Sequence, residues 1–385
     1  MSVEFLPGNA ITLLETGDAY FPALEAAIDA AMHEVHLEAY IFEPDTTGRR
    51  IADALMRACA RGVRVRLVID GFGSMDLPPA FREELRNAGV RLLVFRPSRS
   101  PWSLRRHRLR RLHRKTAVID GATAFIGGIN IIDDRVVPGA KPRYDFALQI
   151  RGPLLEPIYQ AVRRLWIRLV FANLRHRRQN TSTLTPVKAA TGPMRAAFLQ
   201  RDNLKHRGEI EDAYLAAIEG ARSEIIIANA YFFPGRRFRQ ALLEATKRGV
   251  RVVLLMQGQI EFLLIYYASR ALYGSFLDAG VEIFEYRQSN LHAKVAVVDG
   301  RWATVGSSNI DPFSLLLALE ANVAVDDQEF GALLRTRLLA AIEEGATRME
   351  KKRWEDEPLS RRAATWLFYG LARFAIGAIG YAGWH

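Results

Sequence analysis

Hydrophobic and polar positions along the chain form blocks that predict alternating helices and strands. Residues 17 to 35 place small apolar side chains at helical spacing, and an apolar run typical of a buried strand follows directly. A second helical block ends at Gly62, a residue type common just after a helix. The later blocks are 35–42 (strand), 49–61 (helix), 63–69 (strand), 79–88 (helix) and 90–95 (strand). This order predicts a mostly parallel sheet covered by helices.

The same order of blocks returns about 190 residues later, where the segment from Glu224 to Pro234 matches the segment from Glu34 to Pro44. A period of this length is too long for a solenoid. We therefore predict an α/β protein of two tandem repeats, each a mostly parallel sheet flanked by helices, packed about a pseudo-twofold axis. The expected divisions are a first half at 1–178, a linker at 179–192, a second half at 193–350 and a C-terminal tail at 351–385.

Each half contains one copy of a short motif, His-x-Lys-x-x-x-x-Asp, followed by a small-residue turn that ends in asparagine. One copy offers a single imidazole and a single ammonium, and a lone copy is more often an ordinary pair on a strand edge. Two copies at matching places make coincidence a poor explanation. The residues are His113, Lys115, Asp120 and Asn130 in the first half and His292, Lys294, Asp299 and Asn309 in the second.

Two such copies facing one cavity suit a phosphodiester substrate. On a strand, side-chain alternation places the histidine and lysine of one copy on the same face. The lysines would neutralise non-bridging oxygens. One histidine would attack phosphorus, and the other would protonate the leaving alkoxide and later deprotonate the acceptor hydroxyl. This chemistry requires no cofactor and no metal, and no cluster with metal-ligand spacing lies near the motifs.

Four acidic residues accompany the motifs. Asp145 and Glu320 each precede an apolar stretch at a similar distance after their motif, so each is a candidate to bond an imidazole N–H and fix its tautomer. Asp120 and Asp299 stand at predicted strand ends, a position that favours turn or ion-pair roles over catalysis.

These motifs resemble those of the phospholipase D superfamily, which is defined by the doubled His-x-Lys-x-x-x-x-Asp pattern. Segments 201–211, 226–234 and 302–312 are similar to bacterial cardiolipin synthases of the B type, and the resemblance extends over about residues 8–350. It implies transfer of a phosphatidyl group between phospholipids through a phosphohistidine, typically converting two phosphatidylglycerols to cardiolipin and glycerol.

The resemblance also implies roles for individual residues. It makes His113 the expected nucleophile and His292 the acid and base. It carries over Lys115, Asp120, Lys294 and Asp299 as catalytic residues, with Asn130, Asn309, Asp145 and Glu320 in support. The alternatives are a phospholipase D hydrolase, a phosphodiesterase or nuclease of the same superfamily, and a catalytically idle scaffold that binds lipid or nucleic acid.

Charge and composition extend this picture to a partner. The net charge is +11 and the pI is about 9.9, which suggests an anionic membrane or nucleic acid. The arginine-rich run 96–114 contains no acid and interleaves aromatic and aliphatic side chains, as a lipid surface would require. The residues expected at lipid head groups are Trp102, Arg105, Arg106, Arg108, Arg110 and Arg111.

The remaining features concern location. Residues 363–384 are apolar except for a threonine and an arginine, which favours a helix lying in the membrane interface over a span; packing on the domain is the alternative. A single cysteine fits a reducing compartment, and the N-terminus shows no secretory signal. We expect a peripheral protein on the cytoplasmic face of a bacterial inner membrane. Its substrates would be phosphatidylglycerol and, as an alternative donor, phosphatidylethanolamine, with no nucleic-acid partner.

Overall fold

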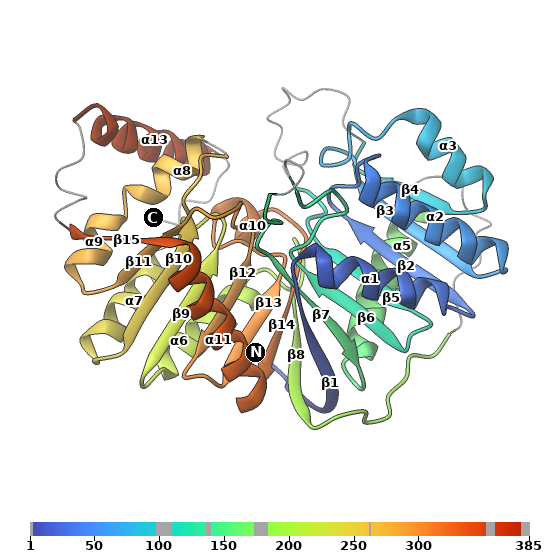
Figure 1. Ribbon diagram of the computed structural model, residues 1–385, viewed down its shortest axis with the longest axis horizontal. Coiled ribbons are helices and arrows are strands. Elements are labelled where there is room, and N and C mark those ends of the chain that lie inside the picture. Colours follow the sequence, from blue (N-terminus) through green and yellow to red (C-terminus); the bar gives the residue numbers. More distant parts are fainter. Residues whose placement is uncertain are drawn as a thin grey trace. The chain divides into compact units, whose positions relative to one another are not determined.

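The computed structural model describes residues 3–97, 110–135, 140–172, 184–261, 263–351 and 359–378. Its elements gather into two compact units (Figure 1). Met1–Gln200 belongs to unit 1, and most of the later chain belongs to unit 2. Two short segments of the second repeat, Val305–Ser307 and Ala318–Ala324, also belong to unit 1. The division between the units therefore differs from the division between the sequence repeats.

The strands of unit 1 lie in the spatial order β8-β1-β7-β6-β5-β2-β3-β4. The strand β1 pairs antiparallel with β7 on one side and with β8 on the other. In chain order the strands are β1 (Leu6–Glu15), β2 (Glu34–Ala39), β3 (Arg64–Asp70), β4 (Arg91–Phe95), β5 (Lys115–Ile119), β6 (Thr123–Gly127), β7 (Phe146–Arg151) and β8 (Met194–Arg201).

Helices cover both faces of this sheet (Figure 1). Leu67 and Ile69 of β3 join a core formed with α1 and α2, whereas Val68 between them packs near Trp166 of α5. Because side chains alternate along a strand, α5 lies on the face opposite α1 and α2. The helices are α1 (Thr16–Asp29), α2 (Thr46–Ala60), α3 (Pro79–Asn87) and α5 (Leu155–Ala172).

The strands of unit 2 include the order β15-β11-β10-β9-β12-β13. They are β9 (Glu224–Asn229), β10 (Arg251–Gln257), β11 (Glu282–Tyr286), β12 (Lys294–Val298), β13 (Trp302–Gly306) and β15 (Ala346–Met349). The last residues of β13 and the first five of β14 (Glu320–Asp326) count with unit 1. The second repeat therefore supplies strand residues to both units.

Two pairs of helices pack together among the described residues of unit 2. The pair α6 and α7 packs through the rings of Tyr214 and Phe238, whose centroids are 5.6 Å apart. The C-terminal helix α13 lies along α8 (Figure 1). The helices are α6 (Glu209–Gly220), α7 (Arg236–Lys247), α8 (Leu263–Arg270), α9 (Tyr273–Asp278), α10 (Pro312–Leu316), α11 (Gln328–Gly345) and α13 (Leu359–Ala378). Within the described residues, no helix combines the length and apolar character needed to cross a bilayer.

The structure corrects the expectation of mostly parallel sheets. Within the described residues, β2-β3-β4 in unit 1 and β9-β10-β11 in unit 2 run parallel. The pairs β2-β5, β5-β6, β6-β7, β9-β12 and β11-β15 are antiparallel. The reason is the length of the connections: helices join the parallel strands, whereas the short turn at Asp120 and Gly121 reverses β5 directly into β6.

Asp120 and Asp299 occupy equivalent turns in the two repeats, each with a positive φ of about 50°. The carboxyl oxygens of Asp120 accept N–H groups of three consecutive residues, Met32 to Glu34, each at 2.8 Å. Those residues lead into β2, so the predicted helix at 17–35 ends early, at Asp29. Asp299 accepts the N–H groups of residues 222, 223 and 224 in the same way.

Candidate active site

Two acceptors hold one ring nitrogen of His113. Its Nδ1 lies 2.9 Å from Oε1 and 3.0 Å from Oε2 of Glu320, and 3.1 Å from the carbonyl oxygen of Ser307. A carbonyl oxygen can only accept, so the proton is assigned to Nδ1 and the lone pair of the neutral ring to Nε2. All three residues lie within unit 1, although Glu320 and Ser307 come from the second repeat.

The carboxyl group of Glu320 is fully buried and is itself held in place. The hydroxyl of Ser307 donates to Oε2 of Glu320 at 2.5 Å and accepts the N–H of Ala321 at 3.1 Å. These bonds orient the carboxyl group toward the imidazole. An acid so placed stabilises the imidazolium that forms during acid–base or nucleophilic catalysis.

Lys115 begins β5, and His113 lies just before the strand rather than on it. The N–H of His113 donates to the carbonyl oxygen of Leu319 at 3.0 Å, outside the β5 pairings. Nζ of Lys115 donates to the carbonyl oxygen of His113 at 2.9 Å. The buried ammonium group is therefore held at the backbone of the histidine two residues before it.

Tyr40 completes the surroundings of His113. Its ring meets the imidazole edge-on with centroids 4.7 Å apart, and Nζ of Lys115 lies 5.1 Å from the ring centroid. Burial raises the pKa of the Tyr40 hydroxyl above its usual value, so the hydroxyl stays protonated at neutral pH. The ring fills the space beside the histidine.

The backbone before His113 is anchored from the end of β3. Oδ2 of Asp70 accepts the N–H of Leu112 at 2.8 Å, and Oδ1 accepts the N–H groups of Phe72 and Gly73 at 2.8 and 3.1 Å. Burial raises the pKa of Asp70, although these three N–H groups favour its ionised form. The end of β3 thus positions the histidine segment.

Unit 2 repeats much of this arrangement around His292. Lys294 begins β12, is fully buried, and donates from Nζ to the carbonyl oxygen of His292. Oε1 of Gln257, at the end of β10, accepts the N–H of Leu291 at 3.2 Å. Gln257 therefore takes the structural place that Asp70 has in unit 1.

Asn130 follows β6 and Asn309 follows β13, each at the end of a small-residue turn. Their side chains are buried, with 5% and 4% of the surface exposed. Oδ1 of Asn130 accepts the N–H of Ile41 at 3.3 Å. Oδ1 of Asn309 is buried without a hydrogen-bond partner in the part of the chain that the structure describes. A buried amide group in this state is suited to a bound polar ligand.

Asp145 directly precedes β7, and Glu320 begins β14, so the two acids stand at similar places in the two repeats. The side chain of Asp145 is buried, and Oδ1 accepts the N–H of Phe146 at 2.8 Å. A Cβ atom added at Gly128 would lie 2.3 Å from this oxygen. The close approach of the carboxyl group thus requires glycine in the turn that carries Asn130.

Asp120 lies at the opposite end of β5 from Lys115, about 16 Å away for a strand of this length. Its oxygens bond backbone N–H groups, as do those of Asp299. Neither carboxyl group can reach a ligand bound beside the histidine of its own motif.

Comparisons with known proteins agree with this geometry. Residues 24–165 and 214–340 match the family described as cardiolipin synthase, PLD-like domain. The chain is 40% identical over 353 residues to cardiolipin synthase B of Escherichia coli strain K12, covering 89% of this chain and 82% of that protein. It is 35% identical over 316 residues to a cardiolipin synthase of Geobacillus kaustophilus, covering 80% of this chain and 61% of that protein. The chain belongs to this family.

Membership in the PLD-like cardiolipin synthase family confirms the predicted superfamily, the α/β fold of two repeats and the enzyme class, a phosphatidyltransferase. The fold is also that of the crystal structure of a phosphatidylserine synthase from Haemophilus influenzae. That structure has a TM-score of 0.72 and 16% identity, and the match covers 98% of this chain and 97% of that one. At this identity the likeness concerns the fold alone.

The structure describes the arginine-rich segment 96–114 only in part. Trp102, Arg105, Arg106 and Arg108 lie outside the described residues. Nη1 of Arg111 lies 3.6 Å from Oδ1 of Asp70, and its guanidinium lies 5.1 Å from the ring centroid of Phe72. Arg96 donates to the carbonyl oxygen of Arg110. The described arginines thus also tie this segment to the end of β3.

Three residues near the histidines were missed by the sequence analysis: Tyr40, Ser307 and Gln257. Tyr40 and Gln257 lie at or just after the carboxyl ends of β2 and β10. Functional residues of open α/β sheets gather at such ends, a signal that the sequence offered. Ser307 stands in the small-residue turn before Asn309, where its hydroxyl and carbonyl roles depend on contacts that only the fold brings together.

Proposed function

We propose that this protein makes cardiolipin by transferring a phosphatidyl group from one phospholipid to the glycerol hydroxyl of phosphatidylglycerol. His113 acts as the nucleophile and His292 as the acid and base. The observation that carries the proposal is the pair of acceptors at Nδ1 of His113. They place the lone pair on Nε2 and support the positive charge that develops when Nε2 attacks phosphorus.

The reaction proceeds in two displacements at phosphorus. In the first, a P–N bond forms to His113 while the P–O bond to the leaving alcohol breaks, and the alkoxide takes a proton from His292. In the second, the acceptor hydroxyl returns a proton to His292, its oxygen bonds phosphorus, and the P–N bond breaks. The head-group alcohol of the donor is released, which is glycerol when the donor is phosphatidylglycerol.

Lys115 and Lys294 neutralise the non-bridging oxygens of the phosphoryl group. Both ammonium groups are buried and each is held by the carbonyl oxygen of the histidine two residues before it. Charges fixed in this way need no reorganisation during the reaction and are strong in a site that excludes water. Asn130 and Asn309 contribute further hydrogen bonds, and Asp145 and Glu320 are positioning acids.

Asp120 and Asp299 are structural in this proposal. Their bonds to backbone N–H groups support a role in holding the first residues of β2 and β9 in place. This assignment differs from the catalytic role that the resemblance implied for the motif aspartates.

The helix α13 provides a surface for the membrane that holds the substrates. Its Thr365 and Ala372 are buried, and the rings of Phe368 and Tyr267 of α8 stack at 5.4 Å. On the outer face, large apolar side chains are exposed: Trp366 (62%), Leu367 (61%), Leu371 (47%) and Phe374 (76%). An exposed apolar face of this kind suits the boundary between head groups and acyl chains.

This face and the net charge of +11 support peripheral association with the anionic inner leaflet of a bacterial membrane. The partners are phosphatidylglycerol and, as a second donor, phosphatidylethanolamine. The apolar face also favours lipid over nucleic acid, which the arginines alone would not distinguish.

The direct test is incubation of the purified protein with phosphatidylglycerol vesicles and detection of cardiolipin and released glycerol. His113→Ala and His292→Ala should each abolish the product. DNA cleavage without cardiolipin would overturn the lipid assignment, and phosphatidic acid alone would make the protein a hydrolase.

The roles of the two histidines have a separate test. A short reaction of His292→Ala with lipid labelled in the phosphate should leave a phosphohistidine on the protein, because protonation and turnover are slowed. His113→Ala should carry no label. Label in His113→Ala but not in His292→Ala would reverse the assignment.

A further inference from the structure

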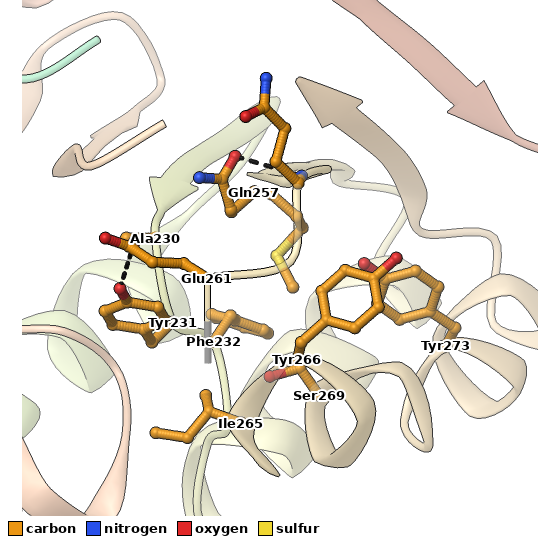
Figure 2. A pocket seen from close by; sticks show the side chains of 11 residues that line it. Ala230, Tyr231, Phe232, Gln257, Glu261, Ile265, Tyr266, Ser269 and Tyr273 are labelled. Carbon is orange, nitrogen blue, oxygen red and sulfur yellow. Dashed lines mark hydrogen bonds between the residues drawn. The ribbon is translucent and has the colours of Figure 1, made fainter. Parts of the chain in front are cut away.

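A small pocket opens in unit 2 where β9 and β10 end and α8 begins (Figure 2). It leaves about 20 Å³ for the centres of water-sized groups, room for about one or two of them. Figure 2 shows Tyr231 and Glu261 on one side and the rings of Tyr266 and Tyr273 on another. The residues used below are Ala230, Tyr231, Gln257 and Glu261.

Gln257 brings an unused donor to this pocket. The residue is 6% exposed, and its Oε1 accepts two N–H groups, from Leu291 at 3.2 Å and from Gln259 at 3.4 Å. These donors fix the amide orientation and leave Nε2 as the remaining polar atom. Nε2 is buried without a hydrogen-bond partner among the described residues. An orphaned buried donor is costly unless a ligand or water satisfies it.

The comparison with unit 1 shows that this donor is not needed to position the histidine segment. Asp70 bonds the N–H of Leu112 just as Gln257 bonds the N–H of Leu291, and a carboxyl group has only acceptors in its ionised form. An acceptor therefore suffices for the shared structural role. The NH2 group of Gln257 is an addition specific to unit 2.

The lining of the pocket also differs from the matching place in unit 1, as the aligned repeats show. Ala230 stands at the position that Tyr40 has in the first repeat. In unit 1 the Tyr40 ring packs on the imidazole of His113 at 4.7 Å. In unit 2 the methyl group of Ala230 lines the pocket instead, and its N–H donates at 3.0 Å to the carbonyl oxygen of Ala293, the neighbour of His292.

The pocket also holds an acceptor. The hydroxyl of Tyr231 donates to Oε2 of Glu261 at 2.5 Å, which orients this exposed carboxyl group at the pocket. Nε2 of Gln257 can only donate, and the carboxyl oxygens accept. A group that both accepts and donates, such as a hydroxyl, matches this pair.

We propose that the unit 2 pocket seats the second hydroxyl of a polyol head group, so that the neighbouring hydroxyl of the same acceptor is presented at His292. The pocket thereby selects a glycerol head group over one that ends in an ammonium group, which has no lone pair to accept from Nε2 of Gln257. This inference rests on the proposed phosphatidyl transfer and assigns the residues that select its acceptor.

A competition between two soluble alcohols tests the pocket. The protein is given phosphatidylglycerol vesicles with equal amounts of deuterated glycerol and ethanolamine, and the two lipid products are measured by mass. Gln257→Glu keeps the oxygen that bonds Leu291 and replaces the donor by a second acceptor that attracts ammonium. We expect the ratio of deuterated phosphatidylglycerol to phosphatidylethanolamine to fall at least tenfold.

The ratio compares two products of one reaction, so a change in the amount of folded enzyme does not alter it. Gln240→Glu, an exposed position on α7, is the matched control and should keep the wild-type ratio. A ratio within twofold of wild type in Gln257→Glu would overturn the proposal. Absence of both lipids with the wild-type protein would instead refute phosphatidyl transfer itself.

Filling the pocket gives a second, independent measurement. Ala230→Tyr introduces the side chain that the first repeat carries at this position. We expect the ratio of alcohol transfer products to phosphatidic acid to fall about tenfold, since water needs no pocket. An unchanged ratio in protein with the wild-type melting temperature would overturn the proposal.

Discussion

Glu320 bonds Nδ1 of His113 at 2.9 Å although 207 positions separate the two residues in the chain. The carboxyl group is fully buried and the bond depends on a residue of the other repeat. Removing its charge while keeping its shape therefore isolates the electrostatic part of the interaction.

Glu320→Gln should lower kcat for cardiolipin formation by about two to four orders of magnitude, with a small change in KM. The amide removes the charge that stabilises the imidazolium and can present an N–H to Nδ1, which favours the wrong tautomer. Initial rates on phosphatidylglycerol vesicles provide the measurement. Glu329→Gln, at an exposed site on α11, is the control. Wild-type kcat in Glu320→Gln would contradict the positioning role.

Asp120→Ala should act on stability rather than on the chemical step. The substitution leaves three N–H groups without their acceptor, and we expect a loss of about 1–3 kcal/mol in the free energy of unfolding. Urea unfolding gives this value, and kcat of the folded protein should stay within a few fold of wild type. A large fall in kcat at unchanged stability would restore the catalytic assignment.

Asp134 should make stability depend on pH. Burial raises its pKa to about 7, even though the N–H of Gly17 donates to its carboxyl group. The folded state therefore binds more protons at this site than the unfolded state between about pH 4 and pH 7. Stability from this group is fully present below pH 4 and is lost as pH rises through 7.

Asp134→Asn keeps an acceptor for Gly17 and cannot ionise. Relative to wild type, the Asp134→Asn protein should be more stable at pH 8 than at pH 5. Urea unfolding at both pH values gives the two differences in the free energy of unfolding. Asp133→Asn, at the neighbouring exposed position, serves as the comparison. An equal difference at both pH values would show that Asp134 does not titrate in this range.

Replacing the exposed apolar residues of α13 should weaken binding to vesicles. A Trp366→Ser and Phe374→Ser double variant removes two large side chains that are 62% and 76% exposed. The partition coefficient on phosphatidylglycerol vesicles, measured by sedimentation, should fall at least tenfold, because burying one such side chain is worth about 1.5–3 kcal/mol. Phe171→Ser, 67% exposed on α5, is the matched control. If the double variant and Phe171→Ser lost vesicle binding to the same extent, binding would depend on exposed apolar side chains in general and not on α13.

Local pattern was enough to predict the elements that carry long periodic runs. The helices α2 and α3 and the strands β3 and β4 lie within two or three residues of the predicted ranges. The strands β6 and β13 were missed because they are short segments between turns, and β1 because its apolar positions alternate only in part.

The candidate site was predicted as a set of residues but not as an arrangement. The doubled motif identified His113 and Lys115, and spacing identified Glu320 as a supporting acid, the role now proposed for it. Spacing gave no means to pair this acid with the histidine of the other repeat, because that pairing depends on which strands adjoin. The role of Gln257 likewise depends on its contact with Leu291, which two distant strand ends create.

The second repeat contributes Glu320 to unit 1, and this contribution has a consequence for the ancestry of the chain. An ancestor with a single copy of the repeat would have had to receive this carboxyl group from a second identical subunit. Joining two such copies in one polypeptide makes the pairing independent of protein concentration. Once joined, the two copies can diverge. Ala230 occupies the position equivalent to Tyr40, and Gln257 occupies the position equivalent to Asp70. Two identical subunits could not carry such differences.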